Sequence, residues 1–210
     1  YMVGKIGNDY FGEVLKRNLS KYGVDTTYIT TVSVHTGISV VNSMEDGSLV
    51  STIARGANDW LTQNDIDQAE EIISNSKVVI LQLEIPMNVV EYTIKKAKKY
   101  NCYVILNGAP AYEIPEDVLK LVDCFVVNES EASFYAGKEI SGYGDAEKVC
   151  DMLYAKVGQH LIITLGEEGS LIYNGKERIY IPPNRVKAVE TTGAGDSYIG
   201  AFAYAKISGM

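Results

Sequence analysis

The sequence has few of the residues that build disulfide frameworks and metal clusters. Its 210 residues include three cysteines and two histidines. Cys102, Cys124 and Cys150 are odd in number, widely spaced and without a Cys-x-x-Cys pair, which argues against a disulfide scaffold or a zinc site. His35 and His160 have no partner histidine at metal-ligating spacing. We therefore expect free thiols in a reducing compartment, which is the cytoplasm by default.

Basic charge and long apolar runs are also scarce. The chain carries 19 Lys and Arg against 27 Asp and Glu, a formal net charge of -8. Nucleic-acid binding needs a basic footprint, so no nucleic-acid partner is expected. Phosphate is still an eligible ligand, because backbone N–H groups can bind it without net positive charge. No run of about 18 apolar residues occurs, so no membrane span is expected either.

What the sequence does contain is a regular alternation of apolar runs and amphipathic stretches. Apolar residues at helical spacing predict helices over 11–22, 66–73, 87–97, 146–157 and 196–206. Short apolar runs predict strands over 78–83, 103–106, 124–127 and 160–165, and a hairpin of 170–173 with 177–181 around Asn174-Gly175. Strands separated by helices form βαβ units. The expected fold class is therefore α/β, with a mainly parallel sheet covered on both faces.

Residues 32–58 break this rhythm. The stretch Val32–Ile53 is rich in β-branched residues and is interrupted by Glu45-Asp46-Gly47-Ser48, which is typical of a hairpin turn. We expect a small β-rich lid at 32–58 and an α/β core formed by 1–31 and 59–210. Both ends of the sequence run directly into structured patterns, so we expect the chain to be part of a longer protein.

Polar residues follow several of the predicted strands. Glu84, Asn107, Asn128 and the turn Thr164–Gly169 each come at or just after the end of an apolar run. In an open α/β sheet, ligands bind beyond the carboxyl ends of the strands. We therefore expect the functional site at this edge.

The strongest chemical pattern is Glu190-Thr-Thr-Gly-Ala-Gly-Asp196, which leads into the last predicted helix. Gly193 and Gly195 allow the backbone to approach an anion closely. The helix N-terminus adds unpaired N–H groups and the positive end of the helix dipole. Asp196 on the first turn could accept the proton of a hydroxyl that attacks phosphorus. An ordinary helix start with a first-turn acid explains the same residues, and physics alone leaves both open.

This segment resembles the C-terminal signature of the ribokinase (PfkB) family of carbohydrate kinases, whose core is Asp-Thr-x-Gly-Ala-Gly-Asp. Other segments resemble that family in the family's own order: Thr36-Gly-Ile-Ser, Arg55-Gly-Ala-Asn58, Leu81-Gln-Leu-Glu-Ile-Pro86, Leu106-Asn-Gly-Ala-Pro-Ala111, Asn128-Glu-Ser-Glu131 and Thr164-Leu-Gly-Glu-Glu-Gly169. The resemblance covers essentially the whole chain. It implies a three-layer α/β/α ribokinase-like fold with a mainly parallel central sheet and a small β lid.

The resemblance implies an ATP-dependent sugar kinase, with ribose as the first expected substrate and ribose 5-phosphate as the product. Asp196 would be the base that deprotonates the primary hydroxyl of the sugar. In the turn that begins at Gly193, the N–H groups of Ala194, Gly195 and Asp196 would stabilise charge on the transferring phosphoryl group. Glu84 would hydrogen-bond sugar hydroxyls, although an acid near a helix N-terminus needs no such role.

The resemblance also implies residues for ATP and Mg²⁺. ATP would be contacted by Asn128, Thr164, Leu165, Gly166, Glu167, Glu168, Gly169 and Gly195. Glu131 would help to organise Mg²⁺ through water. Asn128 and Glu131 are also spaced as a helix N-cap and its capping-box partner, and Thr164–Gly169 also reads as a plain turn between strands. A helix cap at 128–131 and a plain turn at 164–169 therefore stay open as alternatives to Mg²⁺ and ATP binding.

Two further implications concern potassium and assembly. Glu190 and Thr192 match positions that bind a monovalent cation, usually potassium, although Glu190 stands where the family has Asp. Lids in the family commonly pair between subunits, which implies a homodimer through the lid. The family's early sugar-binding Asp and its Gly-Gly-x-x-Asn motif have no counterpart in the sequence. A fructokinase, a nucleoside kinase or a non-catalytic sugar- or nucleotide-binding protein therefore remain alternatives, and we expect the 210-residue chain alone to be inactive.

Overall fold

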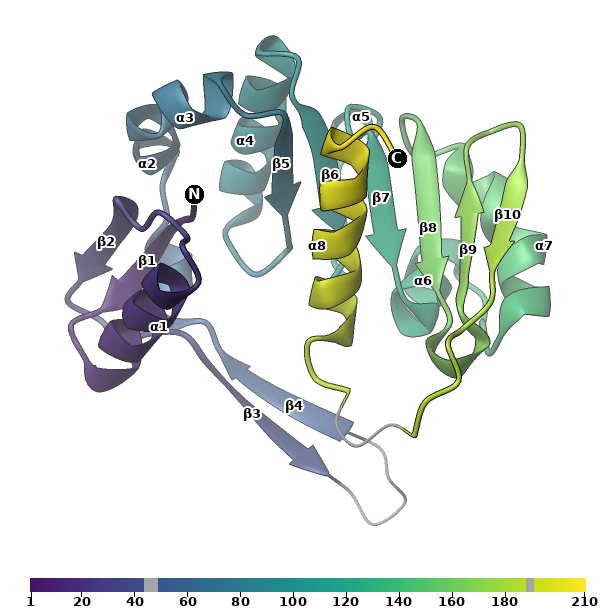
Figure 1. Cartoon of the computed structure of the whole chain (residues 1–210), viewed down its shortest axis with the longest axis horizontal. Coiled ribbons are helices and arrows are strands. Elements are labelled where there is room, and N and C mark those ends of the chain that lie inside the picture. Colours follow the sequence, from purple (N-terminus) through teal and green to yellow (C-terminus); the bar gives the residue numbers. More distant parts are fainter. Residues whose placement is uncertain (44–48, 188–190) are drawn as a thin grey trace. The chain divides into compact units, whose positions relative to one another are not determined.

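The computed structural model describes residues 1–43, 49–187 and 191–210 (Figure 1). The chain forms two compact units. The first comprises Tyr1–Ile72 and Glu84–Thr93, and the second comprises Ile73–Leu83 and Ile94–Met210. Both combine helices with strands, so the predicted α/β class is confirmed.

The first unit is built on a two-stranded parallel sheet. Strands β1 (Val3–Gly7) and β2 (Tyr28–Val32) pair in register from Val3 with Tyr28 to Gly7 with Val32, and helix α1 (Tyr10–Lys21) connects them. The sequence analysis predicts α1 but neither strand. The β1 sequence VGKIG contains two glycines and a lysine, which hide its strand character. The β2 residues continue into the β-branched stretch, so they do not stand out as a separate strand.

A second two-stranded sheet in this unit lies in the segment 32–58, for which the sequence analysis predicts a lid. Strands β3 (Ile38–Ser43) and β4 (Leu49–Ala54) pair antiparallel, as the sequence predicts. The predicted turn at 45–48 lies outside the described residues. Buried Thr36 fixes the base of β3, because its N–H and hydroxyl donate to the Asp9 carboxylate and its hydroxyl oxygen accepts from the Gly7 N–H.

Short helices follow the β3–β4 pair. A 3₁₀ turn η1 (Gly56–Trp60) precedes α2 (Gln63–Gln68) and α3 (Glu70–Ser74), and α4 (Met87–Lys99) comes later in the chain. The single helix predicted over 66–73 is wrong, because Ala69 leaves the helical conformation with φ -90 and ψ 8. Lys5 of β1 forms an ion pair of 2.8 Å with Asp65, which attaches α2 to the sheet.

The second unit is built on a six-stranded sheet with the order β10-β9-β8-β7-β6-β5. Its parallel part consists of β5 (Val78–Leu81), β6 (Tyr103–Asn107), β7 (Cys124–Val127) and β8 (His160–Thr164). The antiparallel part is the predicted hairpin, formed by β9 (Ser170–Tyr173) and β10 (Arg178–Ile181). The sheet is thus mainly parallel, as expected. Strand β5 ends two residues earlier than predicted, and as an end strand it leaves Ile80 46% exposed.

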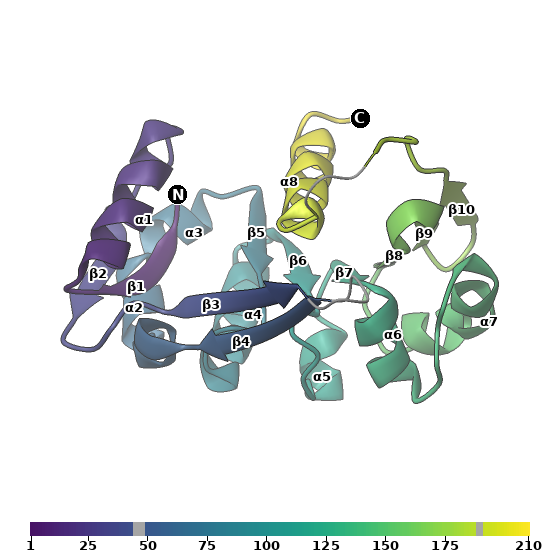
Figure 2. The same cartoon turned by 90° about the horizontal axis from the view of Figure 1, so that it is seen from below.

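Helices cover both faces of this sheet (Figure 2). Helices α5 (Glu116–Leu119), α6 (Glu129–Ala136) and α7 (Tyr143–Tyr154) lie on one face, and α8 (Ala194–Ile207) lies on the other. Ile199 and Ala203 of α8 belong to one buried cluster with Ile105, Cys124, Val126 and Ile162. This packing fixes α8 over the middle of the sheet, and with it the position of the helix start.

A buried carboxylate ties the other end of the sheet together. Asp123, just before β7, accepts hydrogen bonds of 2.7 Å from Lys98 Nζ and the Val104 N–H, and one of 2.9 Å from Gln159 Nε2. These bonds connect α4 through Lys98, β6 through Val104, and the residue before β8, Gln159. The predicted free thiols are confirmed, since Cys102, Cys124 and Cys150 are buried and unbonded to one another.

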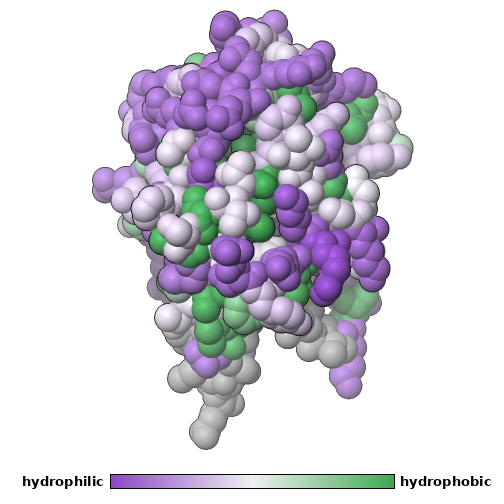
Figure 3. All heavy atoms as spheres, turned by 90° about the vertical axis from the view of Figure 1, so that its left-hand side faces the viewer, coloured by the Kyte–Doolittle hydropathy of each residue, from purple (hydrophilic) through white to green (hydrophobic). Residues whose placement is uncertain are grey.

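The surface mixes polar and apolar side chains. In the first unit, Phe11 and Leu15 of α1 are 57% and 47% exposed. Figure 3 shows apolar atoms in green scattered among hydrophilic ones in purple. Among the described residues, no helix has both the length and the apolar character to cross a membrane.

Candidate active site

A pocket of about 190 Å³ opens at the carboxyl ends of the parallel strands of the second unit. Residues at the ends of β5 to β8 and at the start of α8 form its walls, as the edge rule predicts. The lining residues are Gln82, Asn107, Ala109, Val126, Val127, Asn128, Glu131, Thr164, Gly193, Gly195, Asp196 and Ile199. The structure thus brings the glycine turn, Asp196 and the Asn128–Glu131 pair to one place.

The start of α8 presents free backbone donors. Gly193 is the N-cap with φ +79, a left-handed conformation that favours glycine, and no side chain in the described part of the protein caps the helix. The Ala194 N–H donates to the Thr191 carbonyl oxygen at 3.0 Å, so it is engaged in the turn. Within the described residues, the N–H groups of Gly195 and Asp196 have no protein acceptor. Two of the three predicted anion-hole donors are therefore available.

The Asp196 carboxylate lies on the first turn of α8 and is exposed. Its Oδ1 accepts a hydrogen bond of 3.3 Å from Nε2 of Gln82. Across the described residues its Oδ2 accepts none. The side chain is therefore held at one oxygen and open at the other, beside the positive end of the helix dipole.

Asn128 and Glu131 form the capping box that the sequence allows. Asn128 Oδ1 accepts from the Glu131 N–H, and Glu131 Oε2 accepts from the Asn128 N–H, each at 2.9 Å. Burial raises the pKa of Glu131, and the hydrogen bond from the Asn128 N–H opposes that rise. Both residues also line the pocket. The interpretation of Asn128 and Glu131 as a helix cap is therefore right. Because both residues also line the pocket, they can still contact nucleotide phosphates and hydrated Mg²⁺.

The donors fit Mg²⁺ as a largely hydrated ion. No group of three or more His, Cys, Asp or Glu side chains within the described part of the chain could hold a metal by itself. Mg²⁺ keeps several waters and is commonly held by one or two carboxylates together with substrate phosphates. Glu131, a carboxylate on the wall of the pocket, suits that arrangement.

The turn Thr164–Gly169 is divided between the pocket, the protein interior and the exposed surface. Thr164 lines the pocket, whereas Leu165 is buried and precedes the 3₁₀ turn η2 (Gly166–Glu168). The Glu168 carboxylate accepts from the Tyr143 N–H at 2.8 Å, at the start of α7. Gly169 has φ +88, and a Cβ there would lie 2.1 Å from the Ile181 carbonyl oxygen. Packing thus explains Leu165, Glu168 and Gly169, and their contact with nucleotide stays a prediction.

Two further predicted residues, Glu84 and Thr192, do not line this pocket. Glu84 belongs to the first unit, whereas the pocket lies in the second. Glu190 lies outside the described residues. Thr192 is described and exposed, and it does not line the pocket. Sugar binding by Glu84 and cation binding by Glu190 and Thr192 stay predictions.

Comparison with known proteins decides the family. The family model for "pfkB family carbohydrate kinase" matches residues 1–210. The chain belongs to the pfkB family of carbohydrate kinases. The resemblance found in the glycine turn and in the other segments is thereby confirmed.

Individual relatives are pentose kinases. The chain is 34% identical over 205 residues to a deoxyribokinase of Salmonella typhi, covering 97% of the chain and 67% of that protein. It is 35% identical over 202 residues to a ribokinase of Haemophilus influenzae, covering 95% of the chain and 66% of that protein. The chain spans about two thirds of the length of these relatives.

Solved structures confirm the ribokinase-like fold. The Arabidopsis thaliana ribokinase complexed with ribose and ATP is 30% identical with a TM-score of 0.89, over 99% of this chain and 69% of that one. The ribokinase of Thermotoga maritima is 33% identical with a TM-score of 0.83, over 99% of this chain and 67% of that one.

The candidate pocket contains a polar side chain, that of Gln82, which the sequence analysis does not single out. Gln82 lies within the predicted strand 78–83, so its side chain receives no role there. The signal was available, because Gln82 is the one polar residue in the run Val-Val-Ile-Leu-Gln-Leu. Ala109 also lines the pocket without having been singled out.

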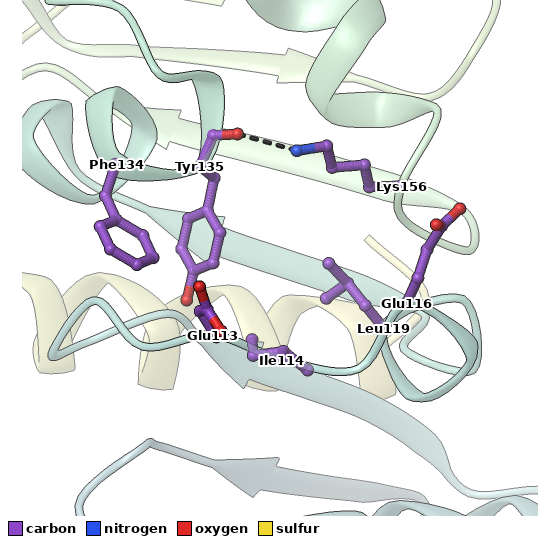
Figure 4. Close-up of a pocket in the computed structure, with 7 residues that line it drawn as sticks. All are labelled: Glu113, Ile114, Glu116, Leu119, Phe134, Tyr135 and Lys156. Atoms are coloured by element: carbon purple, nitrogen blue, oxygen red, sulfur yellow. Dashed lines mark hydrogen bonds between the residues drawn. The ribbon is translucent and has the colours of Figure 1, made fainter.

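A larger cavity of this kinase, about 430 Å³, lies away from these groups (Figure 4). It is lined by Glu113, Ile114, Glu116, Leu119, Phe134, Tyr135 and Lys156. Its charged groups are partly engaged, since Lys156 Nζ donates to the Tyr135 carbonyl oxygen at 2.9 Å and Glu116 pairs with Lys120 at 2.7 Å. None of the predicted site residues lines it, so the smaller pocket is the candidate active site despite its size.

Proposed function

We propose that the protein transfers the γ-phosphoryl group of ATP to a primary hydroxyl of a pentose, with ribose giving ribose 5-phosphate. The observation that supports this most directly is that Asp196 lies beside N–H groups at the start of α8 that have no acceptor among the described residues. A base and an anion-stabilising backbone at one helix start are what in-line phosphoryl transfer requires of a protein.

The chemistry follows from these positions. The open oxygen of Asp196 takes the proton of the sugar hydroxyl as its oxygen attacks the γ-phosphorus. The bond from that phosphorus to the oxygen bridging to the β-phosphate breaks, and ADP leaves. The N–H groups of Gly195 and Asp196 donate to the phosphoryl oxygens as charge develops there. Mg²⁺, when bound, would neutralise phosphate charge, with Glu131 holding it through water and Asn128 contacting the phosphates.

Named complexes of relatives favour these ligands. The Arabidopsis ribokinase structure contains ribose and ATP, and a ribokinase of Cryptococcus neoformans, 25% identical with a TM-score of 0.80, contains ADP. We extend the nucleotide and the sugar from those proteins to this one. Potassium activation through Glu190 and Thr192 is part of the same proposal.

A second acceptor, 2-deoxyribose, has its own support. The deoxyribokinase of Salmonella typhi is 34% identical to the chain, against 35% for the Haemophilus ribokinase. This difference is too small to favour one sugar. Ribose and 2-deoxyribose differ by one hydroxyl, and a site that hydrogen-bonds that hydroxyl discriminates strongly against its absence.

The test is a coupled ADP-release assay on the full-length protein with ribose, 2-deoxyribose, fructose and adenosine. Turnover with a pentose is expected. Preference for fructose or adenosine would point instead to a fructokinase or a nucleoside kinase. Binding of sugar without turnover would indicate a non-catalytic protein on this scaffold.

The catalytic base is tested by Asp196→Asn. Loss of the proton acceptor should lower kcat by about 10²- to 10⁴-fold while the Kd for ATP stays within about twofold. Asp145→Asn is the matched control, because Asp145 is a first-turn acid of α7 outside the pocket. Near-normal kcat in Asp196→Asn would exclude Asp196 as the base.

We also propose a homodimer formed through the β3–β4 pair. Ile38, Val40, Val41 and Ile53 on these strands are between 41% and 53% exposed. Apolar side chains on both faces of a two-stranded sheet favour association with another surface.

A further inference from the structure

A side chain from a distant part of the sequence holds the proposed base. Nε2 of Gln82 lies 3.3 Å from Oδ1 of Asp196, although 114 positions separate the two residues. We propose that Gln82 is a positioning residue, which holds one oxygen of the Asp196 carboxylate so that the other faces the acceptor hydroxyl. This inference rests on the proposed function, in which Asp196 is the base.

The backbone around Gln82 is fixed on both sides. Leu81 pairs with Leu106 in the β5–β6 ladder. On the other side, the Leu83 N–H donates to the Ala109 carbonyl oxygen at 2.9 Å, and the Leu83 side chain is 3% exposed. Gln82 therefore extends from a rigid point on the sheet, which is what precise orientation of a second side chain requires.

Asp196 has no comparable support of its own. In the described residues, the bond from Gln82 is the only hydrogen bond to its carboxylate. The packing of Ile199 and Ala203 places the helix but leaves the exposed Asp196 side chain free to change rotamer. Gln82 is thus the contact that selects one orientation of the carboxylate.

The chemical type of residue 82 matters as much as its position. An ionised carboxylate only accepts hydrogen bonds, so the amide must direct its NH₂ group toward Asp196. The bond occupies Oδ1 and leaves Oδ2 open for the substrate proton. Its length is typical of catalytic contacts before substrate binds, which tighten in the reacting complex.

Three substitutions at position 82 separate the effects of side-chain length, hydrogen-bond donation and charge. Gln82→Met keeps the approximate length and removes the donor. Gln82→Glu keeps the length and places a like charge beside Asp196. Gln82→Lys restores a donor on a longer chain. Gln68→Met, at an exposed position of α2 outside the pocket, is the matched control.

The experiment measures kcat, KM for ATP, KM for the sugar and melting temperature in the full-length protein. We expect kcat to fall about 10-fold in Gln82→Met and about 100-fold in Gln82→Glu, with both KM values within about twofold of wild type. Gln82→Lys should recover part of the loss. The control should match wild type.

The outcomes separate the two proposals. A wild-type protein that phosphorylates no sugar would overturn the proposed function itself. An active wild type, inactivated by Asp196→Asn but unaffected by Gln82→Met and Gln82→Glu, would overturn only the role of Gln82. A raised KM for the sugar at unchanged kcat would also overturn it, because Gln82 would then contact substrate. If kcat fell equally in all three variants and their melting temperatures fell as well, Gln82 would be a residue that stabilises the fold and not one that positions Asp196.

Discussion

Glu131 combines two tasks in one carboxylate. It accepts the Asn128 N–H as part of the α6 capping box, and it lines the pocket where Mg²⁺ is proposed to bind. Burial raises its pKa above the ordinary value of 4.5. A side chain kept only for capping would not need a charge, because glutamine serves equally well at this position of a capping box.

Glu131→Gln should therefore separate the two tasks. The amide oxygen can still accept the Asn128 N–H, so α6 should remain intact by circular dichroism. Turnover at limiting Mg²⁺ should fall about 10- to 100-fold, a range typical of residues that support a metal. Unchanged Mg²⁺ dependence of kcat would mean that Glu131 is a cap alone.

The same substitution predicts a pH dependence of stability. Because the folded-state pKa of Glu131 is raised, the folded chain holds this proton to higher pH than the unfolded chain does. The group's contribution is most favourable below about 4.5 and declines as pH rises through the raised pKa. The melting temperature of Glu131→Gln relative to wild type should therefore increase as pH rises above about 4.5. A constant difference across that range would contradict the assignment.

Site residues were predictable where short-range spacing carries the signal. Asn128 and Glu131 are three positions apart, so the sequence indicates their mutual hydrogen bonds and their shared position. Glu168 could not be interpreted this way, because its partner Tyr143 is 25 positions away. A polar residue in an apolar run marked Gln82 as unusual, but its partner Asp196 could not be predicted, since their contact exists only after β5 and α8 have packed.

At the scale of elements, the start of α8 depends on the backbone of Gly193. Its φ of +79 places it in the left-handed region, which costs other residues roughly 1–2 kcal/mol. Gly193→Ala should lower the free energy of unfolding by about that amount and should reduce kcat by displacing the Gly195 and Asp196 N–H groups. Urea denaturation and steady-state kinetics measure both effects.

Gly200 in the same helix provides the control. It lies within α8, and a Cβ there would meet no described atom within 4 Å beyond the neighbouring backbone of its own helix. Gly200→Ala should raise the free energy of unfolding by about 0.5–1 kcal/mol and leave kcat unchanged. If Gly193→Ala were equally stabilising, the left-handed start of the helix would be wrong.

The elements were predictable in proportion to their length and burial. Helices α1, α4, α7 and α8 and strands β6, β7 and β8 carry long or continuous apolar patterns, and all were predicted. Strand β1 and helix α5 were missed, since five and four residues respectively hold too little periodicity. The break at Ala69 could not be predicted, because a change of backbone conformation at one residue leaves the apolar spacing of 66–73 intact.

At the scale of the whole molecule, the β3–β4 pair predicts self-association. Strand alternation places Ile38 and Val40 on one face and Val41 and Ile53 on the other. Val40→Lys puts a charge at the centre of one face and should shift the full-length protein from dimer to monomer. Light scattering across a concentration series measures the shift.

Val186→Lys is the control for this experiment, since Val186 is 80% exposed and lies after β10 rather than on the pair. It should leave the oligomeric state unchanged. A monomeric wild type at all concentrations would contradict assembly through these strands.

The family and fold class were predictable at this scale because several segments match the pfkB pattern in order along the chain. The order of segments along the chain does not predict which strands are neighbours in the sheet. The sheet order β10-β9-β8-β7-β6-β5 and the meeting of β5 with the start of α8 come from three-dimensional packing.

The late position of α8 in the chain has a consequence for biosynthesis. Ile105, Cys124, Val126 and Ile162 are all translated before the helix that covers them. A growing polypeptide therefore exposes this apolar patch until α8 leaves the ribosome, and the start of α8 joins the walls of the candidate pocket in the same step. Chaperone capture of nascent chains at this patch should fall once α8 has emerged.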